Sequence, residues 1–250
     1  MKTKNNCVDY FRSFKNYTDI PSRDCFAARM AKKYPDDEMA HYQDPEYVDA
    51  AYYFFGFAGK KVVGLFKALL NGRHEDVLTK TERKQFCDPK IIVDLGAGVG
   101  LLTAEMKKLF PNAIVYYVNL RGPQWDEAKK IFQKENVSIK MRESICGIPQ
   151  ADIVLAIYYF EHFQKMGREV CQTLKSLRPD ILIDMTDPQH AFIGHFPTYR
   201  INGKTIPHTK CHREYTKLLA RKNYFRHPLT KKCWNSIPKV YTKPMKEGAE

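Results

Sequence analysis

The stretch that decides the fold of this chain is Ile91–Met106, which reads IIVDLGAGVGLLTAEM. Its first residues form a short apolar run typical of a buried strand, and the residues after Gly100 have the spacing of a helix. Between the two, Gly96, Gly98 and Gly100 predict a tight turn, because residues without a Cβ let the backbone approach a bulky ligand. A strand, a glycine-rich turn and a helix in this order predict a binding loop.

Short apolar runs and helical patterns continue to alternate beyond this stretch. Strands are expected at 91–95, 113–118, 137–142, 152–159 and 180–185, and helices at 101–110, 125–133 and 166–177. Continuously apolar strands indicate a sheet that is covered on both faces. The alternation therefore predicts an α/β fold with a doubly wound, mostly parallel sheet and helices on both faces.

The motif D-L-G-A-G-V-G at 94–100 resembles the first motif of the class I (Rossmann-like) S-adenosylmethionine-dependent methyltransferases. It differs from the dinucleotide motif G-x-G-x-x-G, because Leu101 stands where the last glycine would be. The resemblance covers residues 85–188 and implies a seven-stranded type of sheet, S-adenosylmethionine as cofactor and methyl transfer as activity. It implies that the loop passes under the methionine part of the cofactor, and the loop residues assigned to the cofactor are Asp94, Gly96, Ala97, Gly98 and Gly100.

Two other family positions carry unusual residues. The family usually has an acidic residue after the second strand to bind the ribose hydroxyls, and this chain has Asn119. An Asp often contacts the adenine after the third strand, and this chain has Ser144. Both residues bind more weakly than a carboxylate, so a non-catalytic binding subunit stays an alternative. The resemblance also implies that three further residues contact the cofactor, namely Leu120, Ile145 and Ile157.

The end of the fourth expected strand corresponds to the reaction centre of the family. Ligands of open α/β sheets bind beyond the carboxyl ends of the strands, so the candidate catalytic residues are Tyr158, Glu161 and His162. Glu161 or His162 would act as the base for a hydroxyl or ammonium acceptor, and the alternative is that both cap the next helix. The aromatic residues 158–160 either stack on a base or belong to the core.

The cysteine and histidine residues near the C-terminus predict no metal site. The spacing of His208, Cys211 and His212, with a distant Cys233, matches none of the usual zinc frameworks.

Three regions are expected along the chain. Residues 1–84 are a helical N-terminal region, with helices near 47–70 and 74–86, that forms a lid or a substrate platform. Residues 85–190 are the S-adenosylmethionine-binding methyltransferase core. Residues 191–250 are a basic region that completes the sheet edge and contains a basic amphipathic helix at 211–226.

Charge is concentrated in the C-terminal region. The chain of 250 residues has a formal net charge of +13, and the segment 200–246 holds 13 basic residues and a single acidic one, Glu214. Six aromatic residues are interleaved with these charges: Tyr199, Tyr215, Tyr224, Phe225, Trp234 and Tyr241. Lysines and arginines that neutralise phosphates, with aromatic stacking platforms, indicate a nucleic-acid partner, and RNA is favoured. The alternative is a methyltransferase for a small molecule or a protein side chain, because the F-E-H-F ending (160–163) looks more like small-molecule members of the family.

The bulk composition excludes several classes of protein. No apolar stretch is long and uncharged enough to span a membrane, and the N-terminus lacks the apolar core of a signal peptide. Seven irregularly spaced cysteines indicate reduced thiols. We therefore expect a cytoplasmic or nuclear protein that is not secreted, while the oligomeric state stays open.

Overall fold

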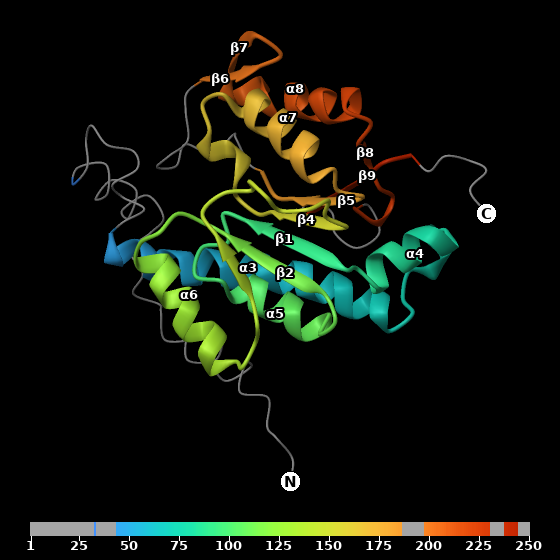
Figure 1. The fold of residues 1–250 in the computed structure, drawn as a ribbon. Helices are drawn as coiled ribbons and strands as arrows, with labels where there is room; N and C mark the ends of the chain where they lie inside the picture. The colour runs from blue at the N-terminus through green and yellow to red at the C-terminus, as the bar shows by residue number, and fades with distance from the viewer. Residues whose placement is uncertain (1–32, 34–43, 187–197, 231–237, 245–250) are drawn as a thin grey trace.

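The computed structural model describes Lys33 and residues 44–186, 198–230 and 238–244. Within these residues, seven strands form one sheet in the order β3-β2-β1-β4-β5-β9-β8, and two strands form a separate hairpin (Figure 1). The sheet strands are β1 (Ile91–Leu95), β2 (Ile114–Val118), β3 (Lys140–Arg142), β4 (Ile153–Ala156), β5 (Ile181–Asp184), β8 (Phe225–Arg226) and β9 (Lys239–Thr242). Strands β1 to β5 are parallel, and β9 runs antiparallel to both β5 and β8.

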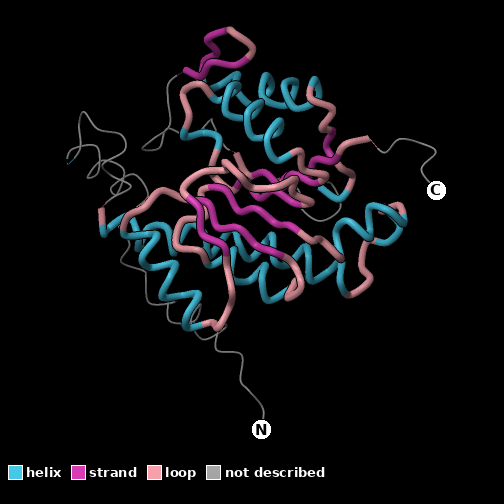
Figure 2. Tube along the Cα trace, viewed as in Figure 1, coloured by secondary structure: helices cyan, strands magenta, loops and turns pink. Residues whose placement is uncertain are grey.

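Helices cover both faces of the sheet, as Figure 2 shows. Successive strand residues alternate between the two covered faces: Ile92 packs in a cluster with Phe66, whereas Val93 packs in a cluster with Val170 and Tyr215. All of these side chains are buried. The expected doubly wound α/β sheet is therefore confirmed.

One face is covered by α3 (Pro45–Leu70), α5 (Leu101–Leu109) and α6 (Pro123–Lys134). The C-terminal half of α3 packs directly on the sheet through Val62, Phe66 and Leu69. At its other end, the Tyr52 hydroxyl donates a hydrogen bond to Glu127 of α6. The described part of the region 1–84 thus shares a core with residues 85–190.

The opposite face carries α7 (Met166–Leu177), α8 (His208–Arg221) and a hairpin of β6 (Thr198–Ile201) and β7 (Lys204–Pro207). We did not predict this hairpin, although Asn202-Gly203 is a dipeptide typical of its turn. The helix expected at 211–226 begins earlier, at His208, and ends at Arg221. It stops there because Asn223 has a left-handed backbone (φ 62°) and the chain then enters β8.

The helix expected at 74–86 is interrupted. The chain forms a short 3-10 helix, η3 (Glu75–Val77), and then α4 (Lys80–Cys87). The Thr79 side chain accepts a hydrogen bond from the Glu82 amide and the Glu82 side chain accepts one from the Thr79 amide, so this capping box starts a new helix. Among the described residues, no helix has the length and apolar character needed to cross a membrane.

Candidate functional site

The carboxyl ends of three adjacent strands meet at one point of the sheet edge. Leu95 of β1 lies in register with Val118 of β2 and with Ala156 of β4. The glycine loop follows β1, Asn119 follows β2 and Tyr158 follows β4. The parallel register therefore brings these segments to the edge where open α/β sheets bind their ligands.

The glycine loop has a backbone that only glycine adopts easily. Gly96, Gly98 and Gly100 have φ angles of 61°, 54° and 78°, all left-handed. A Cβ atom on Gly100 would lie 2.7 Å from the Phe132 ring of α6, so this glycine also lets α5 and α6 approach each other. The Ala97 amide donates to the Val118 carbonyl at 3.2 Å, which fixes the loop to β2.

Asp94 is a buried carboxylate at the start of the loop, with 1% of its surface exposed. Its Oδ2 accepts a hydrogen bond from the Thr103 hydroxyl at 2.6 Å, and its Oδ1 has no hydrogen-bond partner among the residues that the structure describes. Burial raises the pKa of Asp94 to about 7, and the Thr103 hydrogen bond partly opposes this rise. A buried carboxylate oxygen without a donor is costly, and a nearby cation would offset that cost.

Asn119 is tied to the glycine loop through its amide nitrogen. Nδ2 lies 3.2 Å from the Gly98 carbonyl, 3.1 Å from the Tyr117 hydroxyl and 3.1 Å from Gln124 Oε1. The Tyr117 hydroxyl itself donates to the Gly98 carbonyl at 2.7 Å. Because acceptors surround Nδ2, the orientation of the amide is fixed, and Oδ1 makes no hydrogen bond within the described chain.

The remaining cofactor candidates lie in different environments. Leu120 follows Asn119 and is 46% exposed, which is unusual for a leucine next to a buried strand. Ser144 is exposed, and its hydroxyl accepts a hydrogen bond from the Cys146 amide. Ile145 is partly buried against the core, whereas Ile157 is fully buried within it. The side chain of Ile157 is therefore out of reach of a ligand in this structure.

Tyr159, one of the aromatic residues 158–160 expected either to stack on a base or to belong to the core, lies against the glycine loop. A Cβ atom on Gly96 would sit 2.7 Å from Cδ2 of the Tyr159 ring. The Tyr159 hydroxyl donates to Glu169 of α7 at 3.1 Å, and its ring packs edge-on against Phe160 and Phe163. Burial raises the pKa of Tyr159, and the Glu169 carboxylate adds to that rise.

The three candidate catalytic residues differ in accessibility. Tyr158 has a left-handed backbone (φ 53°), which ends the expected strand at Ala156 and turns its half-buried side chain toward the α3 side of the sheet. Glu161 and His162 lie in a 3-10 helix, η4 (Phe160–His162). Glu161 is fully buried, and His162 is half-buried. Of the two candidate bases, His162 is therefore the accessible one.

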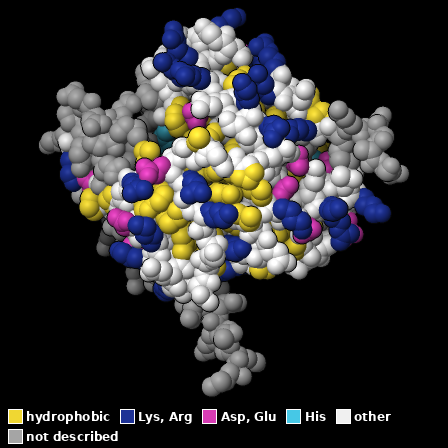
Figure 3. Space-filling view, viewed as in Figure 1, with side chains coloured by type: hydrophobic (Ala, Val, Ile, Leu, Met, Phe, Trp, Pro, Cys, Tyr) yellow, Lys and Arg dark blue, Asp and Glu magenta, His cyan; other side chains and the backbone are white. Residues whose placement is uncertain are grey.

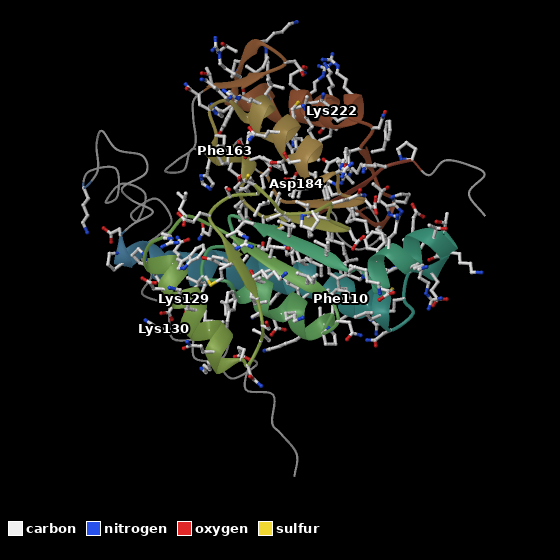
Figure 4. The ribbon with its side chains drawn as sticks, in the orientation of Figure 1. Phe110, Lys129, Lys130, Phe163, Asp184 and Lys222 are labelled. Atoms are coloured by element: carbon white, nitrogen blue, oxygen red, sulfur yellow. The ribbon has the colours of Figure 1, made fainter. Side chains whose placement is uncertain are left out.

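Asp184 is a second buried carboxylate, at the end of β5 (Figure 4). Its Oδ1 accepts hydrogen bonds from the amide and the hydroxyl of Thr186. Burial raises its pKa, and the hydrogen bonds from Thr186 and the charge of Lys239 oppose that rise. Asp184 has no exposed surface, and its Oδ2, like Asp94 Oδ1, has no hydrogen-bond partner among the described residues.

The expectation that the C-terminal aromatics are stacking platforms is wrong for most of them. Tyr199, Tyr215, Tyr224 and Tyr241 are each at most 3% exposed and form part of the core on the α7–α8 face. Phe225 is 48% exposed, and Trp234 lies outside the described residues. The aromatic side chains of α8 and β9 face the core, so the lysines and arginines between them face the surface.

The possible zinc ligands do not converge in the described chain. Cys211 is buried, and its Sγ contacts Met166 Sδ at 3.7 Å, while His212 contacts the Lys239 ammonium. The described residues contain no group of three or more His, Cys, Asp or Glu placed to hold a metal ion. Cys233 lies outside them.

Neither the known protein families nor the curated proteins include a match to this sequence. Solved structures do match the fold. LaPhzM superposes with a TM-score of 0.51 at 13% identity, over 86% of this chain and 64% of its own. A candidate O-methyltransferase of Nostoc punctiforme PCC 73102 gives 0.48 at 14% identity, over 78% and 58%. The plantazolicin methyltransferase BpumL, solved with SAH, gives 0.43 at 15% identity, over 63% and 62%. The chain spans roughly three fifths of the length of these three proteins.

This chain has the fold of the class I methyltransferases. Within the methyltransferase fold, Asp94–Gly100 is the loop that begins at the end of the first strand, and β8 and β9 form the far edge of the sheet. The hairpin β6–β7 lies between β5 and α8, against the first turn of α7.

Proposed function

We propose that this chain is an S-adenosylmethionine-dependent methyltransferase whose substrate is a nucleic acid, with RNA favoured. The observation that supports the enzymatic part is the loop at Asp94–Gly100. Three left-handed glycines follow a buried carboxylate with one unpartnered oxygen, at the edge where three strand ends meet.

The residues of this loop fit S-adenosylmethionine. The left-handed glycines shape the loop for the methionine part, although Tyr159 packs against Gly96 and Phe132 against Gly100 in this structure. When ionised, Asp94 would supply negative charge near a ligand that carries positive charge. Asn119 Oδ1 would accept a hydrogen bond from a ribose hydroxyl, since the three contacts of the amide are made by Nδ2, and the exposed Leu120 would offer an apolar surface to adenine. When bound, S-adenosylmethionine would supply an electrophilic methyl group on a sulfonium.

The chain's own residues would position the acceptor and remove its proton. His162 is the proposed base, since it lies just beyond β4 and is half-buried, whereas Glu161 is enclosed. The aromatic group of Tyr159, Phe160 and Phe163 would exclude water beside the glycine loop. In-line transfer needs mainly such alignment.

The nucleic-acid part of the proposal is supported by charge. Most of the described basic residues of the C-terminal region lie on the hairpin, α8 and β8. Those that are exposed are Arg200, Lys204, Lys210, Arg213, Lys217, Arg221, Lys222 and Arg226. A surface of this kind attracts phosphates, and the affinity then falls steeply with salt. A small-molecule or protein substrate needs no such surface.

Calorimetric titration of the purified chain with S-adenosylmethionine tests the cofactor. We expect saturable binding that the substitution Gly96→Ala weakens at least tenfold, with Gly64→Ala on exposed α3 as the control. Absence of heat at millimolar ligand would contradict the proposal and favour a non-catalytic subunit. The missing carboxylate at Asn119 and the Tyr159 ring beside Gly96 would then explain why the cofactor does not bind.

Transfer of a labelled methyl group to total RNA, protein and small-molecule fractions tests the substrate. We expect label in RNA, and a loss of at least tenfold on His162→Ala, with cofactor binding unchanged. Label in the protein or small-molecule fraction alone would contradict the nucleic-acid part while leaving the methyltransferase part intact.

A further inference from the structure

A basic cleft lies where the hairpin meets the first turn of α7. Its volume is about 330 Å³, and it is lined by Lys165, Arg168, Arg200, Asn202 and Gly203. Lys165 and Arg168 come from the start of α7, and the other three come from the end of β6 and the hairpin turn. Two segments separated by more than thirty residues of sequence thus place three cations around one open cleft.

The two sides of the cleft are held rigidly together. A Cβ atom on Gly167 would lie 3.0 Å from Ile201 Cα and 3.1 Å from the Arg200 carbonyl, so this glycine lets the hairpin backbone touch α7. The Arg200 amide donates to the Gln164 carbonyl at 2.8 Å. Ile201 is buried in the core, which anchors the same strand from its other face.

The hairpin turn is also well defined. Ile201 pairs with Lys204, which leaves Asn202 and Gly203 as a two-residue loop with φ angles of 52° and 75°. Two left-handed residues, with Asn followed by Gly, are the favoured turn of a tight hairpin. The cleft wall is therefore a regular element of the fold.

The cations of the cleft are exposed and carry no ion pair within the described chain, whereas several surface lysines do. Lys129, Lys130 and Lys217, for example, pair with Asp126, Glu127 and Glu214. Glu169, the carboxylate next to Arg168 in the sequence, instead accepts a hydrogen bond from the Tyr159 hydroxyl. Three unpaired like charges repel one another, and a bound anion would relieve that repulsion.

Helix α7 connects the cleft with the candidate active site. Arg168 immediately precedes Glu169, whose carboxylate holds the Tyr159 ring against Gly96 of the glycine loop. Figure 3 shows lysine and arginine side chains at the top of the molecule, where Figure 1 places the hairpin and α8, as well as over the rest of the visible face. Helix α7 therefore supplies residues both to the cleft and to the contact beside the glycine loop.

We infer that this cleft binds a backbone phosphate of the nucleic-acid substrate, an inference that rests on the proposed function. Guanidinium groups form paired hydrogen bonds with phosphate oxygens, and two arginines with a lysine and an asparagine amide match one phosphodiester. The cleft recognises the backbone, so it positions the substrate without reading its sequence.

The test compares two double variants with the same change in charge. Arg168→Gln with Arg200→Gln removes two cations of the cleft, and Lys129→Gln with Lys130→Gln removes two from α6, on the other side of the sheet (Figure 4). Binding of fluorescent single-stranded RNA is measured by anisotropy over a range of salt concentrations. Equal thermal unfolding midpoints for the two variants confirm that both are folded.

We expect the cleft variant to bind RNA at least tenfold more weakly, with a log–log salt slope reduced by about 1, while the α6 variant stays within about twofold of the parent. Equal losses in both variants would overturn the cleft and leave general charge as the cause. Equal affinity of the parent for polyglutamate would assign the cleft to an acidic protein instead and would overturn the inference.

Cofactor titration of the same variants separates this inference from the proposed function. We expect the cleft variant to bind S-adenosylmethionine as the parent does. If the parent binds the cofactor and shows no salt-dependent RNA binding, the cleft inference fails while the methyltransferase stands. If the cleft variant loses RNA affinity and the parent binds no cofactor, the cleft stands and the catalytic proposal fails.

Discussion

The ring of Tyr159 lies against the Cα atom of Gly96, so closely that a methyl group on Gly96 would come within 2.7 Å of the ring. This contact joins the loop after β1 to the segment after β4, and Glu169 fixes the far end of the tyrosine through its hydroxyl. The glycine at position 96 is thus required twice, by its left-handed backbone and by its neighbour.

Gly96→Ala should cost about 2 kcal/mol or more of unfolding free energy, because alanine is strained at positive φ and its methyl group meets the ring. In a Tyr159→Ala background the clash disappears and only the backbone strain remains. A double-mutant cycle by chemical denaturation should therefore give a coupling energy of about 1 kcal/mol. Strictly additive effects would show that the contact carries no energy.

The buried Asp94 should make stability depend on pH. Its folded pKa of about 7 lies above its ordinary value of 3.8, so the folded state holds the proton more tightly. The contribution of Asp94 to the unfolding free energy is therefore largest below about pH 4 and decreases as the pH rises to about 7. Above that pH it no longer changes. Relative to the Asp94→Asn variant, the parent protein should lose up to about 4 kcal/mol of unfolding free energy between about pH 4 and pH 7.

Denaturant unfolding of both proteins at intervals from pH 4 to pH 8 measures this difference. Asp126→Asn, which changes an exposed aspartate on α6, is the matched control and should run parallel to the parent. A constant difference between the parent and Asp94→Asn across the window would show that Asp94 is ionised throughout.

Asn119→Asp should destabilise the chain, although an acidic residue is usual at this position in the family that the motif resembles. Asn119 Nδ2 faces the Gly98 carbonyl and Gln124 Oε1, and a carboxylate would bring acceptor against acceptor there. We expect a loss of about 1–2 kcal/mol in unfolding free energy. An unchanged or higher stability would mean that the neighbouring side chains reorient to donate.

Gly167→Ala should loosen the hairpin from α7. Its methyl group would meet backbone atoms of Arg200, Ile201 and Asn202 at 3.0 to 3.3 Å, and backbone yields less easily than a side chain. We expect a cost of about 1–3 kcal/mol by chemical denaturation. Gly64→Ala is the control, because Gly64 lies on the exposed face of α3 and nothing is within 4 Å of its Cβ position. This substitution should raise the unfolding free energy by about 0.5–1 kcal/mol. A neutral Gly167→Ala would contradict the close contact.

The sequence by itself determined the strand–glycine loop–helix unit and the alternation that follows it. These features are local: the strand runs, the helical spacing of 166–177 and the glycines of the loop each act within a few residues. The helix expected there, Met166–Leu177, is the one observed. The doubly wound sheet follows because continuously apolar strands need cover on both faces.

The tertiary structure alone decided which side chains reach the site. The left-handed backbone at Tyr158 places Tyr159 rather than Tyr158 on the glycine loop, and the packing of η4 encloses Glu161 while His162 keeps some exposure. The tyrosines of the C-terminal region are buried because α8 and the hairpin fold over α7 and the sheet. Burial of this kind depends on contacts between segments far apart in the sequence, and no local pattern encodes it.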